Sequence, residues 1–159
     1  MMKRFAFCFF LASALVSTAA AQSTIFVVRH AERADAMKDP DLSEAGRGRA
    51  EALAKALRDA NITAIYVTEF KRTQQTAAPL ARALSITVTV LPAQDSAALI
   101  AKLRALNGNA LVVGHGDTIP NLIKALGVSE PINIAENDYD NLFAVVLDGK
   151  SRLIRLHYP

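Results

Sequence analysis

A chain of 159 residues, 52% of them hydrophobic, is long enough to bury a core of its own as one domain. Its formal net charge of +3 is concentrated near the amino end, because Lys3 and Arg4 are two of the 18 basic residues, against 15 acidic ones. The remaining charges nearly balance, so the composition gives no support to nucleic acid or a membrane surface as a partner, and we expect neither.

Residues 1–21 are typical of a secretory signal peptide. Lys3 and Arg4 form a positive region, Phe5 to Val16 an apolar one, and Ala19 to Ala21 a small-residue cleavage site. The apolar run is shorter than the roughly 20 residues of a membrane span. We therefore expect a periplasmic or secreted protein whose mature domain is 22–159, without a stable membrane span after cleavage. An uncleaved anchor is the minor alternative. Cys8, the only cysteine, would be lost with the leader, so no disulfide is expected.

Strand-like and helix-like segments alternate along the mature chain. Periodicity predicts strands at 24–28, 65–68, 86–90 and 110–113, then a hairpin of strands at 141–147 and 151–157. Helices are predicted after the N-cap Ser43, between residues 69 and 84, after a cap at Asp95 or Ser96, and before Gly127. This order predicts an α/β three-layer sandwich. Its central sheet is mostly parallel, with helices on both faces and a C-terminal antiparallel strand pair.

Two local features have more than one interpretation. The charged segment 32–41 is predicted to be a loop, and it forms either a wall of a site or a solvated connection. Gly46 and Gly48 lie in the first turns of the predicted helix after Ser43. Glycine costs a helix about 1 kcal/mol relative to alanine. Each glycine either permits close backbone approach or is merely tolerated.

Charged and imidazole side chains follow the predicted strands. Arg29 and His30 follow the first strand, Arg72 the second, Asp95 the third and His115 the fourth. The carboxyl ends of parallel strands meet at one edge of a sheet, and ligands bind there. Singly, each residue has an ordinary explanation, such as a solvated charge or a helix cap. Together they predict a site at this edge.

Two guanidinium groups and two imidazoles are suited to a phosphoryl group. Guanidinium forks match phosphate oxygens and do not transfer protons. Nearby cations disfavour protonation of imidazole, so at least one histidine should remain neutral and nucleophilic near pH 7. A neutral imidazole can attack phosphorus and form a phosphohistidine, while the other donates hydrogen bonds to the phosphoryl oxygens. The reaction needs no metal or other cofactor, and two arginines would repel a metal.

Three motifs carry a resemblance to the histidine phosphatase superfamily, also called phosphoglycerate mutase-like. They are Arg29-His30-Ala31, the segment 72–77 with Arg72 before Gln-Thr-Ala, and the segment 112–116 with His115 after an apolar strand. They follow the order of the family and span about residues 24–126. The resemblance implies that His30 is the phosphorylated nucleophile and that Arg29, Arg72 and His115 hold the phosphoryl group. Ala31 stands where the family usually has glycine.

The resemblance also implies a general acid, for which the sequence offers several candidates. Asp95 is slightly favoured and Asp117 is second, although either residue is also a plausible helix cap. Glu32 and Asp35 in the loop are further candidates, and the remaining alternative is that this chain, like some short family members, has no dedicated acid. Mutase-type members carry long insertions that enclose the substrate. This compact chain should have an open site, which favours a phosphatase acting on a small phosphorylated substrate.

Two other functions are compatible with the same residues. One is a phosphodiesterase that uses His30 and His115 as an acid–base pair, and the other is a non-catalytic module that binds phosphorylated ligands. Export favours a periplasmic or extracellular phosphomonoester, such as a sugar phosphate of the cell envelope. Tyr139 is predicted to be a surface or packing aromatic, with substrate contact as the alternative, and His157 is expected to be exposed and without function.

Overall fold

The computed structural model describes residues 22–159, and the predicted signal peptide at 1–21 lies outside them. Within this range, no helix is both long and apolar enough to cross a membrane. The elements in chain order are β1 (Ser23–Arg29), α1 (Glu44–Leu57), β2 (Ile62–Val67), α2 (Lys71–Leu84), β3 (Thr89–Val90), α3 (Ser96–Ala105), β4 (Asn109–Gly114), α4 (Ile119–Ala125), β5 (Asn141–Leu147) and β6 (Arg152–His157).

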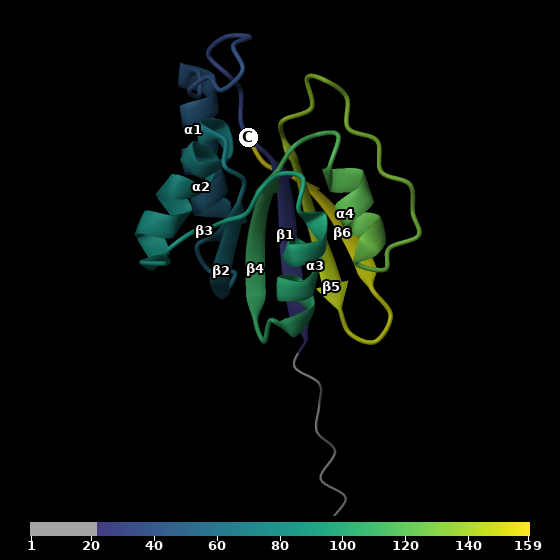
Figure 1. The fold of residues 1–159 in the computed structure, drawn as a ribbon. Coiled ribbons are helices and arrows are strands. Elements are labelled where there is room, and N and C mark those ends of the chain that lie inside the picture. Colours follow the sequence, from purple (N-terminus) through teal and green to yellow (C-terminus); the bar gives the residue numbers. More distant parts are fainter. Residues whose placement is uncertain (1–21) are drawn as a thin grey trace, which may run out of the picture.

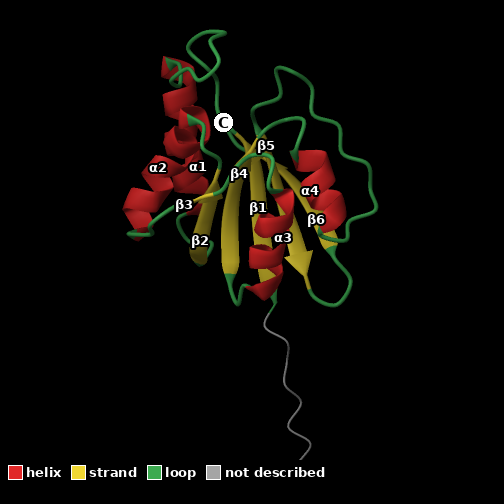
Figure 2. Cartoon of the chain, viewed as in Figure 1, coloured by secondary structure: helices red, strands yellow, loops and turns green. Residues whose placement is uncertain are grey.

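The strands form one six-stranded sheet in the order β3-β2-β4-β1-β5-β6 (Figures 1 and 2). β1 pairs in parallel with β4, β4 with β2, and β2 with β3. β5 is antiparallel to both β1 and β6. The mostly parallel sheet and its C-terminal antiparallel pair confirm the predicted α/β class.

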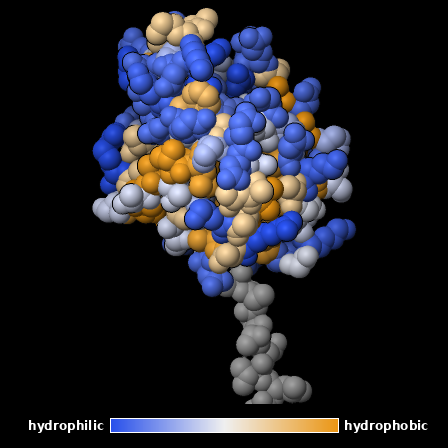
Figure 3. Space-filling view, viewed as in Figure 1, coloured by the Kyte–Doolittle hydropathy of each residue, from blue (hydrophilic) through white to orange (hydrophobic). Residues whose placement is uncertain are grey.

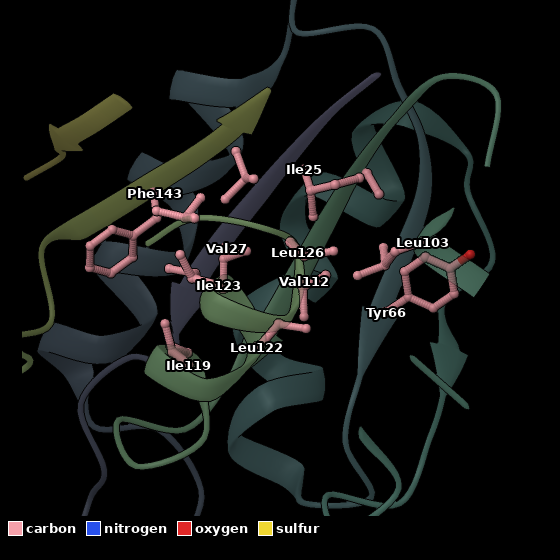
Figure 4. Close-up of a cluster of buried hydrophobic side chains, with 13 residues drawn as sticks. Ile25, Val27, Tyr66, Leu103, Val112, Ile119, Leu122, Ile123, Leu126 and Phe143 are labelled. Atoms are coloured by element: carbon pink, nitrogen blue, oxygen red, sulfur yellow. The ribbon is translucent and has the colours of Figure 1, made fainter. Parts of the chain in front are cut away.

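Helices cover both faces of the sheet, as the alternation of elements predicts. α1 and α2 pack on one face and α3 and α4 on the other (Figure 1). Leu53 and Leu57 of α1 meet Leu80 of α2 in the first core. The second core joins α3 and α4 to the sheet and includes Leu103, Ile123 and the fully buried Phe143 (Figure 4). Burial of these apolar side chains on both faces explains why β1 and β4 are continuous hydrophobic runs.

Two strand predictions need correction. β2 begins at Ile62, three residues earlier than the predicted segment at 65–68, and Thr68 lies just beyond its end. The predicted strand at 86–90 is reduced to Thr89–Val90, because β3 is an edge strand that pairs only with Tyr66 and Val67 of β2. Ile86 and Val88 pack instead against the core of α1 and α2.

The two glycines of α1 differ in what surrounds them. A Cβ atom on Gly46 would overlap the backbone oxygen of Glu32, whereas nothing lies within 4 Å of the equivalent position on Gly48. Gly46 therefore permits the amino end of α1 to pack against the segment that follows β1, and Gly48 is only tolerated. Ser43 caps α1 as predicted, since its side chain accepts a hydrogen bond from Gly46 N at 3.0 Å.

Candidate active site

The carboxyl ends of β1, β2 and β4 meet at the end of the molecule where hydrophilic residues predominate (Figures 1 and 3). A pocket of about 600 Å³ lies there, and Arg29, His30, Arg72 and His115 all line it. Arg29 ends β1, His115 follows β4, and Arg72 lies in the first turn of α2. The structure thus brings together all four residues that sequence reasoning assigned to a phosphoryl site.

His30 is held in one orientation by its own loop. The residue is 4% exposed, and its backbone N–H donates to Gly114 O at 3.0 Å. The Nδ1 atom lies 2.8 Å from Ala31 O, and a carbonyl oxygen accepts only from a protonated nitrogen, so the proton resides on Nδ1. Nε2 is therefore left with a free electron pair.

The surroundings of His30 keep its imidazole neutral at pH 7. Burial is the main reason that the pKa of His30 falls from 6.5 to about 4, and His115, Arg72 and Arg29 lower it further. The hydrogen bond to Ala31 O opposes part of this effect. The expected neutral histidine is present, but burial contributes more to its low pKa than the neighbouring cations do.

His115 adjoins His30, with 5.4 Å between the ring centroids. Its Nδ1 lies 3.4 Å from Nη2 of Arg72, which only donates, and its Nε2 lies 3.1 Å from the Thr68 hydroxyl. Because Nδ1 must accept from the arginine and the hydroxyl can accept from Nε2, neutral His115 carries its proton on Nε2. Burial is again the main reason that the pKa of His115 is lowered, followed by the charge of Arg72.

Arg29 is fixed by the segment between α4 and β5. Its Nη1 donates to the carbonyl oxygens of Ala135 and Glu136, at 3.1 and 2.6 Å. Its guanidinium lies 4.4 Å from the ring centroid of Tyr139, a cation–π distance. Tyr139 is therefore a packing aromatic whose partner is a site residue.

Arg72 is fixed by the loop that precedes α1. Its guanidinium stacks over Phe70 at 4.2 Å, and its Nη1 donates to Lys38 O at 3.3 Å. The nearest carboxylate oxygen, on Asp39, is 3.9 Å away. Burial and the charge of Arg33 lower the pKa of Arg72. The loop 32–41 therefore forms a wall of the site, which was one of its two predicted roles.

Both site arginines retain unused hydrogen-bonding capacity. The Nε atoms of Arg29 and Arg72 are buried and have no hydrogen-bond partner within the part of the chain that the structure describes. A buried N–H without an acceptor costs about 1–3 kcal/mol. An anion bound between the two guanidinium groups would offset this cost.

The four residues considered as the general acid differ in their position relative to the pocket. Asp95 accepts a hydrogen bond from Ala98 N at 3.0 Å as the N-cap of α3, and it does not line the pocket of His30. Glu32 is paired with Arg49, and Asp35 accepts from Met37 N at 2.8 Å. Asp117 alone of the sequence candidates lines the pocket. The slight preference for Asp95 as the general acid therefore has no geometric support.

Sequence reasoning missed several residues of the pocket. Arg33 and Phe70 line it, and Thr68 positions His115. The segment 134–136 lines it as well. Arg33 follows His30 by three residues in the charged loop, and this proximity was an available signal. Nothing in the sequence of the segment 134–136 marks it as part of the site. His157, predicted to be idle, is exposed and pairs with Asp140 at 3.0 Å.

Comparisons with known proteins agree with this architecture. The profile of the histidine phosphatase superfamily (branch 1) matches residues 25–95. The chain has no significant match among curated protein sequences.

Three solved structures share the fold at low sequence identity. The protein histidine phosphatase SixA, solved with tungstate, is 23% identical with a TM-score of 0.71, over 84% of this chain and 96% of its own. An alpha-ribazole phosphatase from Shigella flexneri is 16% identical with a TM-score of 0.70, over 84% and 96%. A mycobacterial glucosyl-3-phosphoglycerate phosphatase, solved with inorganic phosphate, is 18% identical with a TM-score of 0.66, over 82% and 95%.

The matched segment contains the first two motifs, with Arg29, His30 and Arg72, and the third motif brings His115 to the same pocket within the same fold. The chain is thus similar to the histidine phosphatase superfamily over residues 25–95 and shares the fold of the solved structures above.

Proposed function

We propose that the protein is a metal-independent phosphomonoester hydrolase that works through a phosphohistidine on His30. The observation that carries the proposal is the free electron pair on Nε2 of a buried, neutral His30 in a pocket lined by Arg29, Arg72 and His115. The similarity to structures whose names describe phosphatases adds to it.

The first step transfers the phosphoryl group to the protein. Nε2 of His30 attacks phosphorus, the N–P bond forms, and the P–O bond to the leaving group breaks with its electron pair on oxygen. Arg29 and Arg72 neutralise charge on the phosphoryl oxygens, where charge-assisted hydrogen bonds are strong. His115, protonated on binding the anion, donates to the same group. Asp117 and Glu136 are the carboxyl groups that line the pocket, and we assign Asp117, already a candidate from the sequence, to protonate the leaving oxygen.

The second step returns the protein to its starting state. A water molecule attacks phosphorus opposite Nε2 and gives a proton to the Asp117 carboxylate, the N–P bond breaks with its electron pair on Nε2, and inorganic phosphate leaves. The pocket, lined by Arg33 of the loop 32–41 and by residues 134–136 of the connection between α4 and β5, is open to solvent. Entry of water therefore favours hydrolysis over transfer to a second substrate.

The proposed substrate class is a small phosphorylated compound. The similar structures are a protein histidine phosphatase, an alpha-ribazole phosphatase and a glucosyl-3-phosphoglycerate phosphatase. These differ so widely that they support the phosphoryl chemistry and no particular substrate. The predicted signal peptide adds a periplasmic or secreted location to the proposal.

Trapping of the covalent intermediate tests the proposal. The protein is incubated with a ³²P-labelled panel of phosphomonoesters, quenched in alkali to preserve phosphohistidine, and mapped by peptide. We expect label on His30, release of inorganic phosphate in the presence of chelator, and neither in His30→Gln.

The alternatives give different results. Cleavage of a phosphodiester that survives His30→Gln would favour the acid–base pair. Phosphate binding without turnover of any ester in the panel would favour the binding module.

A further inference from the structure

Arg49 of α1 joins the segment that carries His30 to another part of the chain. Its Nε lies 2.9 and 3.0 Å from the two carboxylate oxygens of Glu32, and its Nη2 lies 2.7 Å from Oε1. Its Nη1 also donates to the backbone oxygen of Tyr158 at 3.3 Å. Tyr158 is buried after β6, and its backbone N–H donates to Asp140 O at 3.0 Å. One guanidinium therefore ties two segments to α1, the segment after β1 that carries Glu32 and the segment after β6 that carries Tyr158.

The contact of Arg49 with Glu32 is unlike an ordinary surface ion pair. The side chains are 20% and 23% exposed, and the fork geometry uses both carboxylate oxygens. Another ion pair of α1, from Glu51 to Arg82 of α2, is 3.6 Å long, and its side chains are 68% and 69% exposed. An exposed pair of that kind contributes about 0–1 kcal/mol. A forked, half-buried pair defines a geometry far more tightly.

Glu32 adjoins the peptide group that orients the nucleophile. The carbonyl of Ala31, which accepts from Nδ1 of His30, belongs to the peptide between Ala31 and Glu32. Ala31 N donates to the Thr76 hydroxyl at 2.9 Å, and Glu32 O accepts from Ser43 N at 2.9 Å. These bonds hold the backbone on each side of the carbonyl, and the paired Glu32 side chain restricts its rotation further.

We propose that Glu32 and Arg49 are positioning residues that hold the Ala31 carbonyl toward Nδ1 of His30, so that the nucleophilic electron pair stays on Nε2. In many enzymes a carboxylate orients the histidine directly and selects its tautomer. Here the acceptor is a backbone carbonyl, so a side-chain ion pair next to it takes over that task. The effect on turnover rests on the proposed function, whereas the effect on the His30 tautomer does not.

The tautomer can be measured without any substrate. In the ¹⁵N spectrum of ¹⁵N-histidine-labelled protein at pH 7.5, His30 should show a protonated Nδ1 and an unprotonated Nε2. Glu32→Gln keeps the shape of the side chain but removes its charge, and Arg49→Met removes the guanidinium. In both variants we expect His30 to become a mixture of tautomers, with kcat reduced about 10- to 100-fold, the usual effect of losing an orienting partner. The inhibition constant of inorganic phosphate should change less than threefold, because neither residue lines the pocket.

The matched control is Glu51→Gln, which breaks an ion pair of the same helix that involves neither Glu32 nor Arg49. It should leave the tautomer and kcat as in the wild type. If Arg49→Met does not fold, Arg49→Lys, which keeps the charge and loses the fork, should show the same change in part. Wild-type tautomer signals in a folded Glu32→Gln or Arg49→Lys would overturn the proposal, as would equal losses of kcat in Glu51→Gln. A shifted tautomer in a protein that hydrolyses no phosphomonoester would support the positioning role and contradict the proposed function.

Discussion

The imidazole rings of His30 and His115 lie 5.4 Å apart between centroids and at 62° to each other, and each proton is directed away from the other ring. Nδ1 of His30 donates to Ala31 O, and Nε2 of His115 donates to the Thr68 hydroxyl. The remaining nitrogens, Nε2 of His30 and Nδ1 of His115, are unprotonated in the neutral pair. In the proposed mechanism the first attacks phosphorus and the second takes up a proton and donates to the phosphoryl group.

Loss of either site arginine should reduce catalysis without unfolding the protein. Arg29→Ala or Arg72→Ala removes a charged donor to the transition state, which costs roughly 3 kcal/mol or more. We expect kcat/KM to fall at least about 100-fold in each. Arg82→Ala, an exposed arginine of α2, serves as the control and should retain wild-type kcat/KM. A loss of less than about tenfold in Arg29→Ala and Arg72→Ala would contradict the assigned roles.

Burial of His30 should make stability depend on pH. The unfolded chain takes up a proton on this residue near 6.5, whereas the folded chain does so only near its lowered pKa of about 4. Between these values the unfolded state binds more protons, so the free energy of unfolding should fall as the pH is lowered through this window. From pH 7 to pH 5 the expected loss from His30 is about 2 kcal/mol.

Urea unfolding at the two pH values checks this effect. His30→Gln lacks the titrating group and should lose about 2 kcal/mol less than the wild type over the same interval. Equal losses in the two proteins would show that the pKa of His30 is not lowered.

Asp95 and Asp117 offer a matched pair for the general acid. Asp117→Asn should slow esters with poor leaving groups far more than activated aryl phosphates, because only the former need a proton on the leaving oxygen. Asp95→Ala should leave both rates unchanged and cost about 1 kcal/mol of stability, the usual effect of losing an N-cap. Equal slowing of both ester classes by Asp117→Asn would assign no acid role to Asp117.

Arg33 should attract the phosphorylated substrate electrostatically rather than take part in the reaction of the phosphoryl group. It is exposed at the pocket, where its charge already lowers the pKa of Arg72. Arg33→Ala should raise the KM and the inhibition constant of inorganic phosphate by about 3- to 10-fold at low salt, with little change in kcat. This difference should shrink at high ionic strength, because salt screens exposed charges. A large loss of kcat that is insensitive to salt would instead place Arg33 on the reacting group.

The two glycines of α1 should respond oppositely to alanine. Gly48→Ala should stabilise the protein by up to about 1 kcal/mol, since nothing crowds the new methyl group. Gly46→Ala should destabilise it and reduce kcat, because the methyl group would overlap Glu32 O beside the His30 loop. Thermal unfolding of both variants and assays of turnover check this contrast, which would fail if both variants were stabilised.

Much of this architecture was predictable from local patterns. The apolar runs of β1 and β4, the cap at Ser43 and the turn before β6 each follow from short-range chemistry, and their alternation predicts the parallel sheet. The strand at 86–90 was overpredicted, because β propensity does not reveal that an edge position has a partner on one side only. Asp95 was overrated for a related reason, since its place after an expected strand does not show which way a capping side chain points.

By itself, the sequence determined which residues end the buried strands, and so which side chains meet at the sheet edge, because parallel pairing brings all those ends to one side. Only the tertiary structure decided the protonation and orientation of the two histidines, the role of the segment 134–136, and the pairing of Glu32 with Arg49. These depend on burial and on contacts between residues distant in the chain, and neither is encoded in a local pattern of residue types.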